Sequence, residues 1–185
     1  MDLQWKTHYA RRRPLKTVVV TYMARRPTPV WPERKFCNDT SSFFKCKLWE
    51  NFGERRLGRM VQNEAALIVA LKALETEKRG DDKVVLLRVV DFNLLSFAQQ
   101  VEEDLRIDVM VGPHGAGLTH SAFMRDRARL VELFVDRSQA NRHFHNFAAW
   151  YGRGYHQVNT PNPVNIEAVI GAVREAIAAV NINEY

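Results

Sequence analysis

Runs of hydrophobic residues alternate with stretches of helical spacing along most of the chain. Short apolar or β-branched runs predict buried strands, and apolar residues three or four positions apart predict helices. By these rules the sequence predicts strands at 16–22, 83–90, 108–112, 129–134 and 155–158. It predicts helices at 63–77, 97–105 (with Ser96 as N-cap), 118–124, 141–151 and 165–180. Because strands and helices alternate, we expect βαβ crossovers and an α/β, Rossmann-like parallel sheet flanked by helices.

The pattern favours one domain over residues 17–185, preceded by a basic leader at 1–16. Within that domain the segment 23–62 is rich in proline and glycine and shows no regular period, so a long functional loop is expected there. Trp150, Tyr151 and the phenylalanines are expected to lie in the core. No apolar run reaches the roughly 18 to 20 residues of a membrane span, and the first residues lack the apolar centre of a secretion signal.

Positive charge is concentrated in the first third of the chain. The formal net charge is +6, and residues 1–60 hold 14 Lys and Arg against 5 Asp and Glu, whereas the remainder holds 13 against 16. A nucleic-acid partner is not expected, because no RNA-binding signature, zinc-finger spacing or basic heptad helix accompanies the charge. A small polyanion such as a nucleotide diphosphate would use the same arginines.

Neither the cysteines nor the histidines predict a metal site, and no cofactor is expected. Cys37 and Cys46 are the only cysteines, too few for a four-cysteine zinc site. They are either free thiols or a disulfide beside the glycosylation triplet at 38–40, and both interpretations stay open. His143 and His145 are two positions apart, so they point to different faces of the predicted helix and cannot chelate together.

The stretch VMVGPHGAGLTHSAF at 109–123 contains the strongest candidate site. It turns from a predicted strand into a predicted helix, at the carboxyl edge of the sheet where α/β proteins bind ligands. Backbone N–H groups of Gly115, Ala116 and Gly117 could approach a phosphate closely, and a helix start adds its positive end. Leu118 stands where a Walker loop carries lysine, which argues against nucleotide hydrolysis, and the spacing is not the GxGxxG of nicotinamide enzymes.

Four ordered blocks of sequence carry a resemblance to a known family. They are TYMARR with Arg25, RRLGRMVQNEAAL with Arg56, Arg59, Asn63 and Glu64, SFAQQV with Ser96, Phe97 and Gln100, and GPHGAGLTHSAFM followed by RARLVELF. In this order they resemble glycosyltransferase family 61, over about residues 16 to 155. The resemblance implies an inverting transferase of the GT-B type, in which two Rossmann-like halves meet and the C-terminal half holds most of the donor.

The same resemblance implies a substrate class and a compartment. It implies a UDP-sugar donor of the GlcNAc, xylose or arabinose class, a protein or glycan hydroxyl as acceptor, and no metal. A eukaryotic member would act in the endoplasmic reticulum or Golgi lumen, and a bacterial one in the cytoplasm. Only about 16 residues precede the first predicted strand. We therefore expect the chain to be the C-terminal donor-binding half, with the N-terminal half missing and the chain alone an incomplete enzyme. The alternative is a non-catalytic sugar-nucleotide-binding or interaction remnant of that fold.

Arginines and the bend supply the expected contacts to the diphosphate. Arg25 and Arg59 lie between a strand end and a helix, where guanidinium groups can grip phosphate oxygens, although solvated loop arginines are the alternative. His114 could bind a phosphate or the sugar, or only stabilise the turn. Thr119 could add a hydroxyl or cap the helix, and Leu118 belongs to the same donor-binding block. The catalytic base stays unassigned.

Three polar residues outside the bend complete the expected donor site. Glu132 lies inside an apolar strand, where an unpaired carboxylate would cost several kcal/mol, so it needs a partner. A ribose hydroxyl pair is the preferred partner, and a salt bridge to Arg88 or another arginine is the alternative. Asn63 could bind the donor or cap a helix that begins with Glu64. Gln100 is assigned to the donor from the family block alone.

Overall fold

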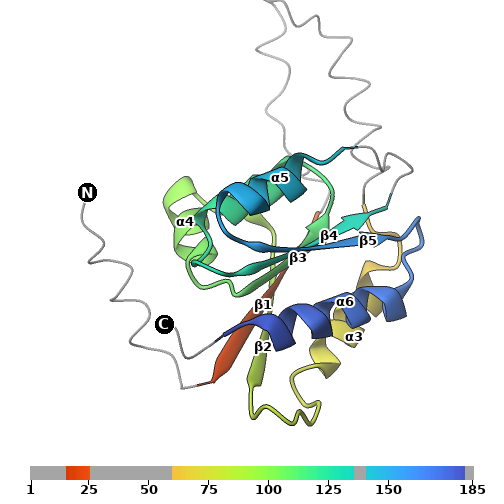
Figure 1. Ribbon diagram of the computed structural model, residues 1–185. Coiled ribbons are helices and arrows are strands. Elements are labelled where there is room, and N and C mark those ends of the chain that lie inside the picture. The colour runs from red at the N-terminus through yellow and green to blue at the C-terminus, as the bar shows by residue number, and fades with distance from the viewer. Residues whose placement is uncertain (1–15, 26–59, 136–140, 182–185) are drawn as a thin grey trace, which may run out of the picture.

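A computed structural model describes residues 16–25, 60–135 and 141–181, and these residues form an α/β domain (Figure 1). All five strands are parallel and lie in the order β2-β1-β3-β4-β5. Their bounds are β1 Thr17–Met23, β2 Val84–Val90, β3 Val109–Pro113, β4 Arg129–Phe134 and β5 Gly154–Asn159. The Rossmann-like parallel sheet predicted from the sequence is confirmed.

Helices cover both faces of the sheet. One face carries α3 (Glu64–Ala73) and α6 (Ile166–Ala179), and the other carries α4 (Phe97–Asp104) and α5 (His143–Trp150), as Figure 1 shows. Two 3-10 helices, η1 (Phe92–Leu94) and η2 (Ala116–Phe123), follow β2 and β3 on the α4 and α5 side. Among the described residues no helix is long and apolar enough to cross a membrane.

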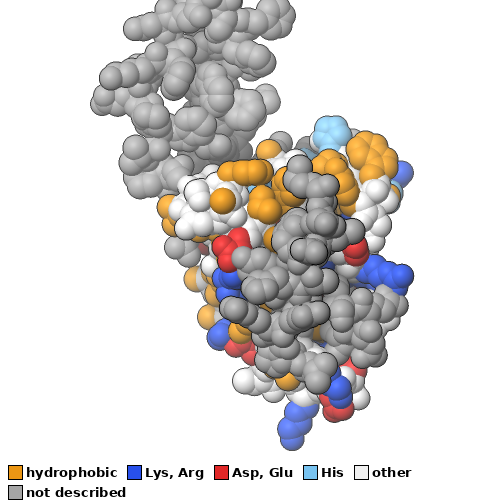
Figure 2. Space-filling model, turned by 90° about the vertical axis from the view of Figure 1, so that its left-hand side faces the viewer, with side chains coloured by type: hydrophobic (Ala, Val, Ile, Leu, Met, Phe, Trp, Pro, Cys, Tyr) orange, Lys and Arg blue, Asp and Glu red, His pale blue; other side chains and the backbone are white. Residues whose placement is uncertain are grey.

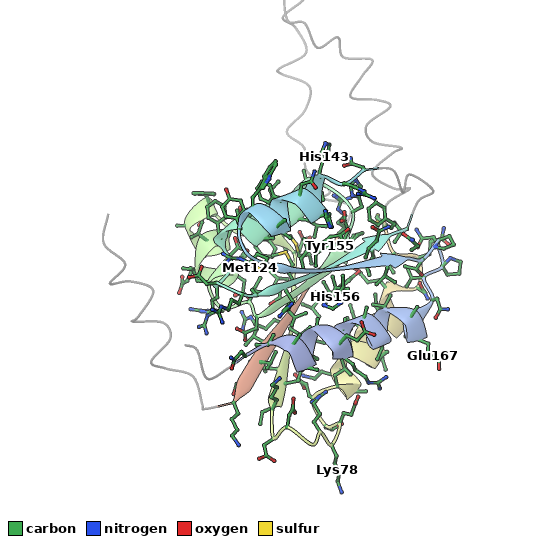
Figure 3. The ribbon with its side chains drawn as sticks, viewed as in Figure 1. Lys78, Met124, His143, Tyr155, His156 and Glu167 are labelled. Carbon is green, nitrogen blue, oxygen red and sulfur yellow. The ribbon has the colours of Figure 1, made fainter. Side chains whose placement is uncertain are left out.

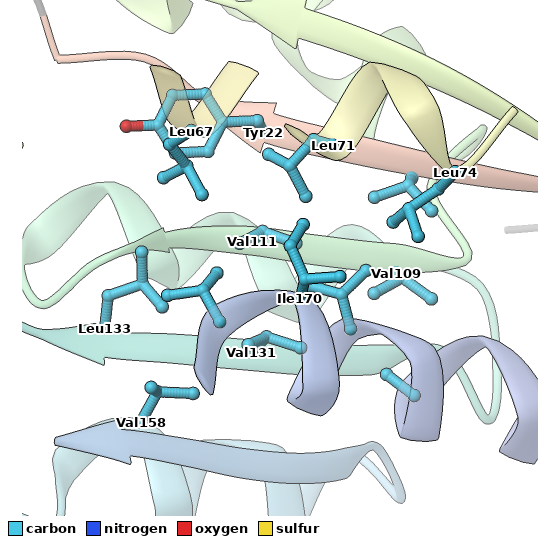
Figure 4. Packing of buried hydrophobic residues seen from close by; sticks show 14 of the residues in the cluster. Tyr22, Leu67, Leu71, Leu74, Val109, Val111, Val131, Leu133, Val158 and Ile170 are labelled. Atoms are coloured by element: carbon cyan, nitrogen blue, oxygen red, sulfur yellow. The ribbon is translucent and has the colours of Figure 1, made fainter. Parts of the chain in front are cut away.

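Two hydrophobic cores lie on opposite faces of the sheet because strand side chains alternate. Val109 and Val111 of β3 face α3 and α6, where Leu71 and Ile170 pack against them in the larger core (Figure 4). Met110, between the two valines, points into the smaller core under α5. Both faces are buried, which is why the central strands are mostly apolar, with Thr21 of β1 and Glu132 of β4 as buried exceptions.

The predicted strands and most helices agree with the structure within a few residues. Ser96 is the N-cap of α4 and forms a capping box with Gln99, as expected. One local prediction is wrong, because the segment predicted as a helix at 118–124 is the 3-10 helix η2. Asn63 stands at the N-cap position of α3, which begins with Glu64 as one of the two alternatives had it, but its side chain makes no cap hydrogen bond. The leader at 1–15 and the loop residues 26–59, with both cysteines and the glycosylation triplet, lie outside the described residues.

Several large apolar side chains lie on the surface. Trp150 is 76% exposed and Tyr151 46%, so the expectation that these two are core residues is wrong. Leu94, Phe97 and Phe123 are exposed as well, and Phe97 meets Phe123 edge to face with ring centroids 6.1 Å apart. Figure 2 shows hydrophobic side chains gathered toward the end of the molecule where α5 lies.

Candidate functional site

The site lies where the strand order reverses. From β1 the chain runs to β2 on one side of it and then returns to β3 on the other. In parallel sheets this reversal opens a crevice beyond the carboxyl ends of the two neighbouring strands. Arg25 follows the end of β1, and the glycine-rich bend at 112–119 follows β3. Two of the predicted donor-binding segments therefore lie at the same edge.

Arg25 lies directly over Gly115 of the bend. A Cβ atom built on Gly115 would lie 2.0 Å from the Nη2 atom of Arg25, and the φ angle of Gly115 is +152°. The backbone angle therefore requires glycine there, and the guanidinium occupies the space that a side chain would fill. The structure brings these two predicted residues together, whereas Arg59 lies outside the described residues.

The bend is held by short-range hydrogen bonds of the 3-10 type. The Leu118 N–H donates to the Gly115 carbonyl at 2.9 Å, and the Thr119 hydroxyl donates to the Ala116 carbonyl at 2.7 Å. Leu118 is buried, so of this residue only the backbone can face a ligand. The expected α-helix start is replaced by a 3-10 turn, in which the N–H of each residue pairs three positions back.

Gly112 and Gly117 are fitted against the end of β1. An added Cβ at Gly112 would meet the Met23 Cβ at 3.2 Å, and one at Gly117 would meet the Met23 Cε at 3.2 Å. Both distances are shorter than an ordinary contact between carbon atoms. The glycines therefore let the bend pack closely on β1 and keep Arg25 within reach.

Glu132 holds two buried side chains beneath the bend. Its Oε1 atom lies 2.5 Å from Nδ1 of His114, and its Oε2 accepts a hydrogen bond of 2.6 Å from the Tyr155 hydroxyl. The Glu132 side chain is fully buried. The His114 ring stacks on Phe134 with centroids 5.0 Å apart and meets Phe144 edge to face at 5.5 Å. We name these three hydrogen-bonded residues, His114, Glu132 and Tyr155, the His–Glu–Tyr triad.

Strand register explains how the triad assembles. Gly112 of β3 lies opposite Glu132 of β4, and His114 stands two residues further along the same face. Tyr155 of β5 lies opposite Leu130, two residues before Glu132, so its long side chain reaches the carboxylate diagonally. Figure 3 shows Tyr155 on the α5 side of the sheet and His156 on the α6 side. Sequence reasoning missed Tyr155, because only the register between strands identifies it.

The partner that a buried Glu132 needs is thus internal. Arg88, the alternative partner named from the sequence, instead binds Glu103 through its Nε and Nη2 atoms. Burial, reinforced by the hydrogen bond to Glu132, raises the pKa of Tyr155 far above its ordinary value. The phenol therefore stays protonated and donates to the carboxylate. A direct contact of Glu132 with a ribose stays a prediction.

Asn63 and Gln100 use their side-chain amides to hold the fold. Asn63 donates to the Val164 carbonyl and accepts from the Val164 N–H, both at 2.9 Å. Gln100 donates to the carbonyls of Phe92 at 2.7 Å and Leu95 at 3.0 Å. Each of these contacts fixes a loop, and the donor-binding role of both residues remains a prediction.

His120 and Asp104 form a second histidine–carboxylate pair, separate from the His–Glu–Tyr triad. The Nδ1 atom of His120 is 2.7 Å from Oδ2 of the fully buried Asp104, and burial raises the pKa of that carboxyl. The imidazole also packs on Phe92 with centroids 4.6 Å apart. Among the described residues no three His, Cys, Asp or Glu side chains gather in a way that could hold a metal ion.

Comparison with known proteins gives the family. The model of Glycosyltransferase 61 matches residues 19–131, which is more than half of the chain and runs from β1 into the first half of β4. The chain therefore belongs to glycosyltransferase family 61. The match includes Arg25, the bend and the segment of Asn63 and Gln100, which the sequence resemblance had singled out.

The chain is also similar to named transferases from animals. The EGF domain-specific O-linked N-acetylglucosamine transferase of Rattus norvegicus is 36% identical over 78 residues, which is 41% of this chain and 13% of the relative. Its counterparts in Gallus gallus and Drosophila melanogaster are 35% identical over 78 residues and 36% identical over 76 residues. The chain thus spans only 13% of the length of these transferases.

Proposed function

We propose that this chain is the donor-binding part of an inverting glycosyltransferase that uses a UDP-sugar. The observation that carries the proposal is the guanidinium of Arg25 lying over Gly115 at the reversal of strand order. There a positive charge meets a bend whose glycines leave the backbone open to close approach, and a diphosphate is the anion that suits both. Without a metal, arginine and backbone N–H groups would stabilise the departing UDP.

Family membership supports glycosyl transfer, and similarity to O-linked N-acetylglucosamine transferases favours GlcNAc among the three candidate sugars. Xylose and arabinose remain the other members of the class, with a protein or glycan hydroxyl as acceptor. The endoplasmic reticulum or Golgi lumen is the proposed compartment, by analogy with those transferases. An N-terminal half-domain would bind the acceptor and supply the catalytic base.

Titration calorimetry with UDP, UDP-GlcNAc and UDP-xylose tests the proposal. We expect the chain to bind UDP and UDP-GlcNAc, and Arg25→Ala to weaken both about ten-fold or more, since a charge-assisted hydrogen bond contributes about 1.5–3 kcal/mol. The matched control is Arg174→Ala, which removes an arginine that pairs with Glu77 between α6 and the segment after α3. Absence of UDP binding, or equal loss in both variants, would refute the proposal.

Measuring sugar transfer distinguishes the donor-binding part of an active enzyme from the non-catalytic alternative. A donor-binding part of an active enzyme should support transfer from UDP-GlcNAc to an acceptor once the N-terminal half is supplied, and little transfer without it. Binding that never leads to transfer in the extended protein would instead favour a sugar-nucleotide-binding remnant.

A further inference from the structure

The His–Glu–Tyr triad determines which atom of His114 can meet a ligand. A carboxylate has only acceptor oxygens, so its short contact with Nδ1 requires a proton on that nitrogen. The Tyr155 hydroxyl donates to the other oxygen of Glu132, so both oxygens of this side chain act as acceptors. In a neutral imidazole with its proton on Nδ1, the Nε2 atom is an acceptor.

The Nε2 atom is the part of His114 that remains open. Among the described residues Nε2 has no hydrogen-bond partner. It is also absent from the set of buried side-chain atoms that lack a partner, so Nε2 must itself be exposed. It therefore belongs to the 6% of the His114 side chain that solvent can reach. His114 is the first residue after β3 and precedes Gly115, over which Arg25 lies. An acceptor atom therefore stands beside a bend that favours an anion.

We propose that Glu132 and Tyr155 are positioning residues that hold His114 with its proton on Nδ1, so that Nε2 accepts a hydrogen bond from a hydroxyl group of the nucleotide sugar. Two groups at this edge of the sheet then recognise different parts of the ligand. Arg25 attracts the diphosphate, and His114 reads a neutral hydroxyl, which the ribose and the transferred sugar both carry. This inference rests on the proposed donor site, although the proton position is a property of the free chain.

Side chains from three elements are packed around the His114 ring in the described part of the chain. Glu132 from β4 hydrogen-bonds the imidazole, Tyr155 from β5 hydrogen-bonds Glu132, and α5 presents Phe144 to the ring. Phe134 stacks on one ring face at an interplanar angle of 19°, and this packing resists rotation of the imidazole. His145 of α5 meets the ring of Tyr155 edge to face, with centroids 5.2 Å apart. Hence the tautomer follows from Glu132.

Nitrogen-15 spectra of the histidine-labelled chain test the proton position without any ligand. We expect His114, assigned from the signal lost in His114→Gln, to show a protonated Nδ1 and an unprotonated Nε2 near neutral pH. Glu132→Gln should move the proton to Nε2, because the new amide can donate to Nδ1. An Nε2-protonated His114 in the unaltered chain, or an unchanged pattern in Glu132→Gln, would overturn the proposal.

Binding measurements test what Nε2 meets. Glu132→Gln should weaken UDP or UDP-GlcNAc about three- to ten-fold, the range of one hydrogen bond, and leave inorganic pyrophosphate within about two-fold. Equal losses for UDP and UDP-GlcNAc identify the ribose hydroxyl, and a loss for UDP-GlcNAc alone identifies the transferred sugar. A matching loss for pyrophosphate would show a phosphate contact and overturn the hydroxyl assignment.

A milder pair of variants covers the case in which Glu132→Gln does not fold. Tyr155→Phe removes one donor to Glu132, and Tyr151→Phe is its control on an exposed tyrosine nearby in sequence. We expect UDP-GlcNAc binding to fall in Tyr155→Phe and to stay constant in Tyr151→Phe, with pyrophosphate unchanged in both. Equal behaviour of the two variants would refute a positioning role for Tyr155. If the unaltered chain binds no nucleotide, the donor site fails, and the ligand-free spectra still decide the proton position.

Discussion

At the scale of single residues, Gly115 carries the tightest constraint at the site. Its φ of +152° is rarely adopted by residues with a side chain, and the guanidinium of Arg25 fills the space where a Cβ would go. The glycine thus links backbone geometry to the charge at the site. The sequence predicted that Gly115 would let the backbone approach a ligand closely. It did not predict that Arg25 would lie over this glycine.

Gly115→Ala should damage both folding and binding. We expect it to lower the free energy of unfolding by about 1–3 kcal/mol because of the strained φ, and to abolish UDP binding because Arg25 must move. Gly171→Ala is the matched control, since it lies within α6 with no atom within 4 Å of its added Cβ. That change should stabilise the chain by about 0.5–1 kcal/mol. Chemical denaturation measures both variants, and equal effects would contradict the steric argument.

At the scale of elements, the local sequence pattern predicted those strands and helix ends that depend on interactions between nearby residues. The β4 strand at 129–134 and the cap of α4 at Ser96 follow from short-range preferences, and both agree with the structure. The η2 segment does not, because its small residues allow a 3-10 turn that is selected by the Thr119 hydroxyl and the packing of Leu118. Asn63 has the sequence position of a helix cap, yet its amide bonds a loop about 100 residues away.

Asn63→Ala tests this long-range clamp. The substitution removes two hydrogen bonds between the Asn63 side chain and the backbone of Val164. The N–H and carbonyl groups of Val164 then lose their partner. We expect a loss of about 1–3 kcal/mol in the free energy of unfolding, with UDP affinity of the folded chain unchanged. Asn146→Ala, on the exposed face of α5, is the control and should have little effect. Weaker UDP binding by folded Asn63→Ala would instead support the donor-binding role inferred from the family.

At the scale of the whole molecule, the site depends on strand order and register. Composition and periodicity predicted a parallel sheet covered on both faces, but not that β1 would lie between β2 and β3. That order brings Arg25 to the bend, and the β4–β5 register brings Tyr155 to Glu132. Such pairings arise between segments far apart in sequence, so no single stretch encodes them. The bend itself was recognisable because its glycines are contiguous.

Hydrogen exchange locates the ligand on this framework. Short labelling times report local openings, so a bound ligand should slow exchange where it covers the backbone. With saturating UDP we expect slower exchange in peptides spanning 112–119 and the end of β1 at 23–25, because these meet where the strand order reverses. Peptides from β2 and α6 should change little.

The Arg25→Ala variant makes the same experiment decisive. If Arg25 attracts the diphosphate to the bend, this variant should lose most of the UDP-dependent protection at 112–119 at the UDP concentration that saturates the unaltered chain. Its exchange without UDP should stay close to normal in β3 and β4, since their backbone pairing does not involve Arg25. Protection that persists in Arg25→Ala, or that appears at the opposite edge of the sheet, would place the ligand elsewhere and remove the basis for a donor site between β1 and β3.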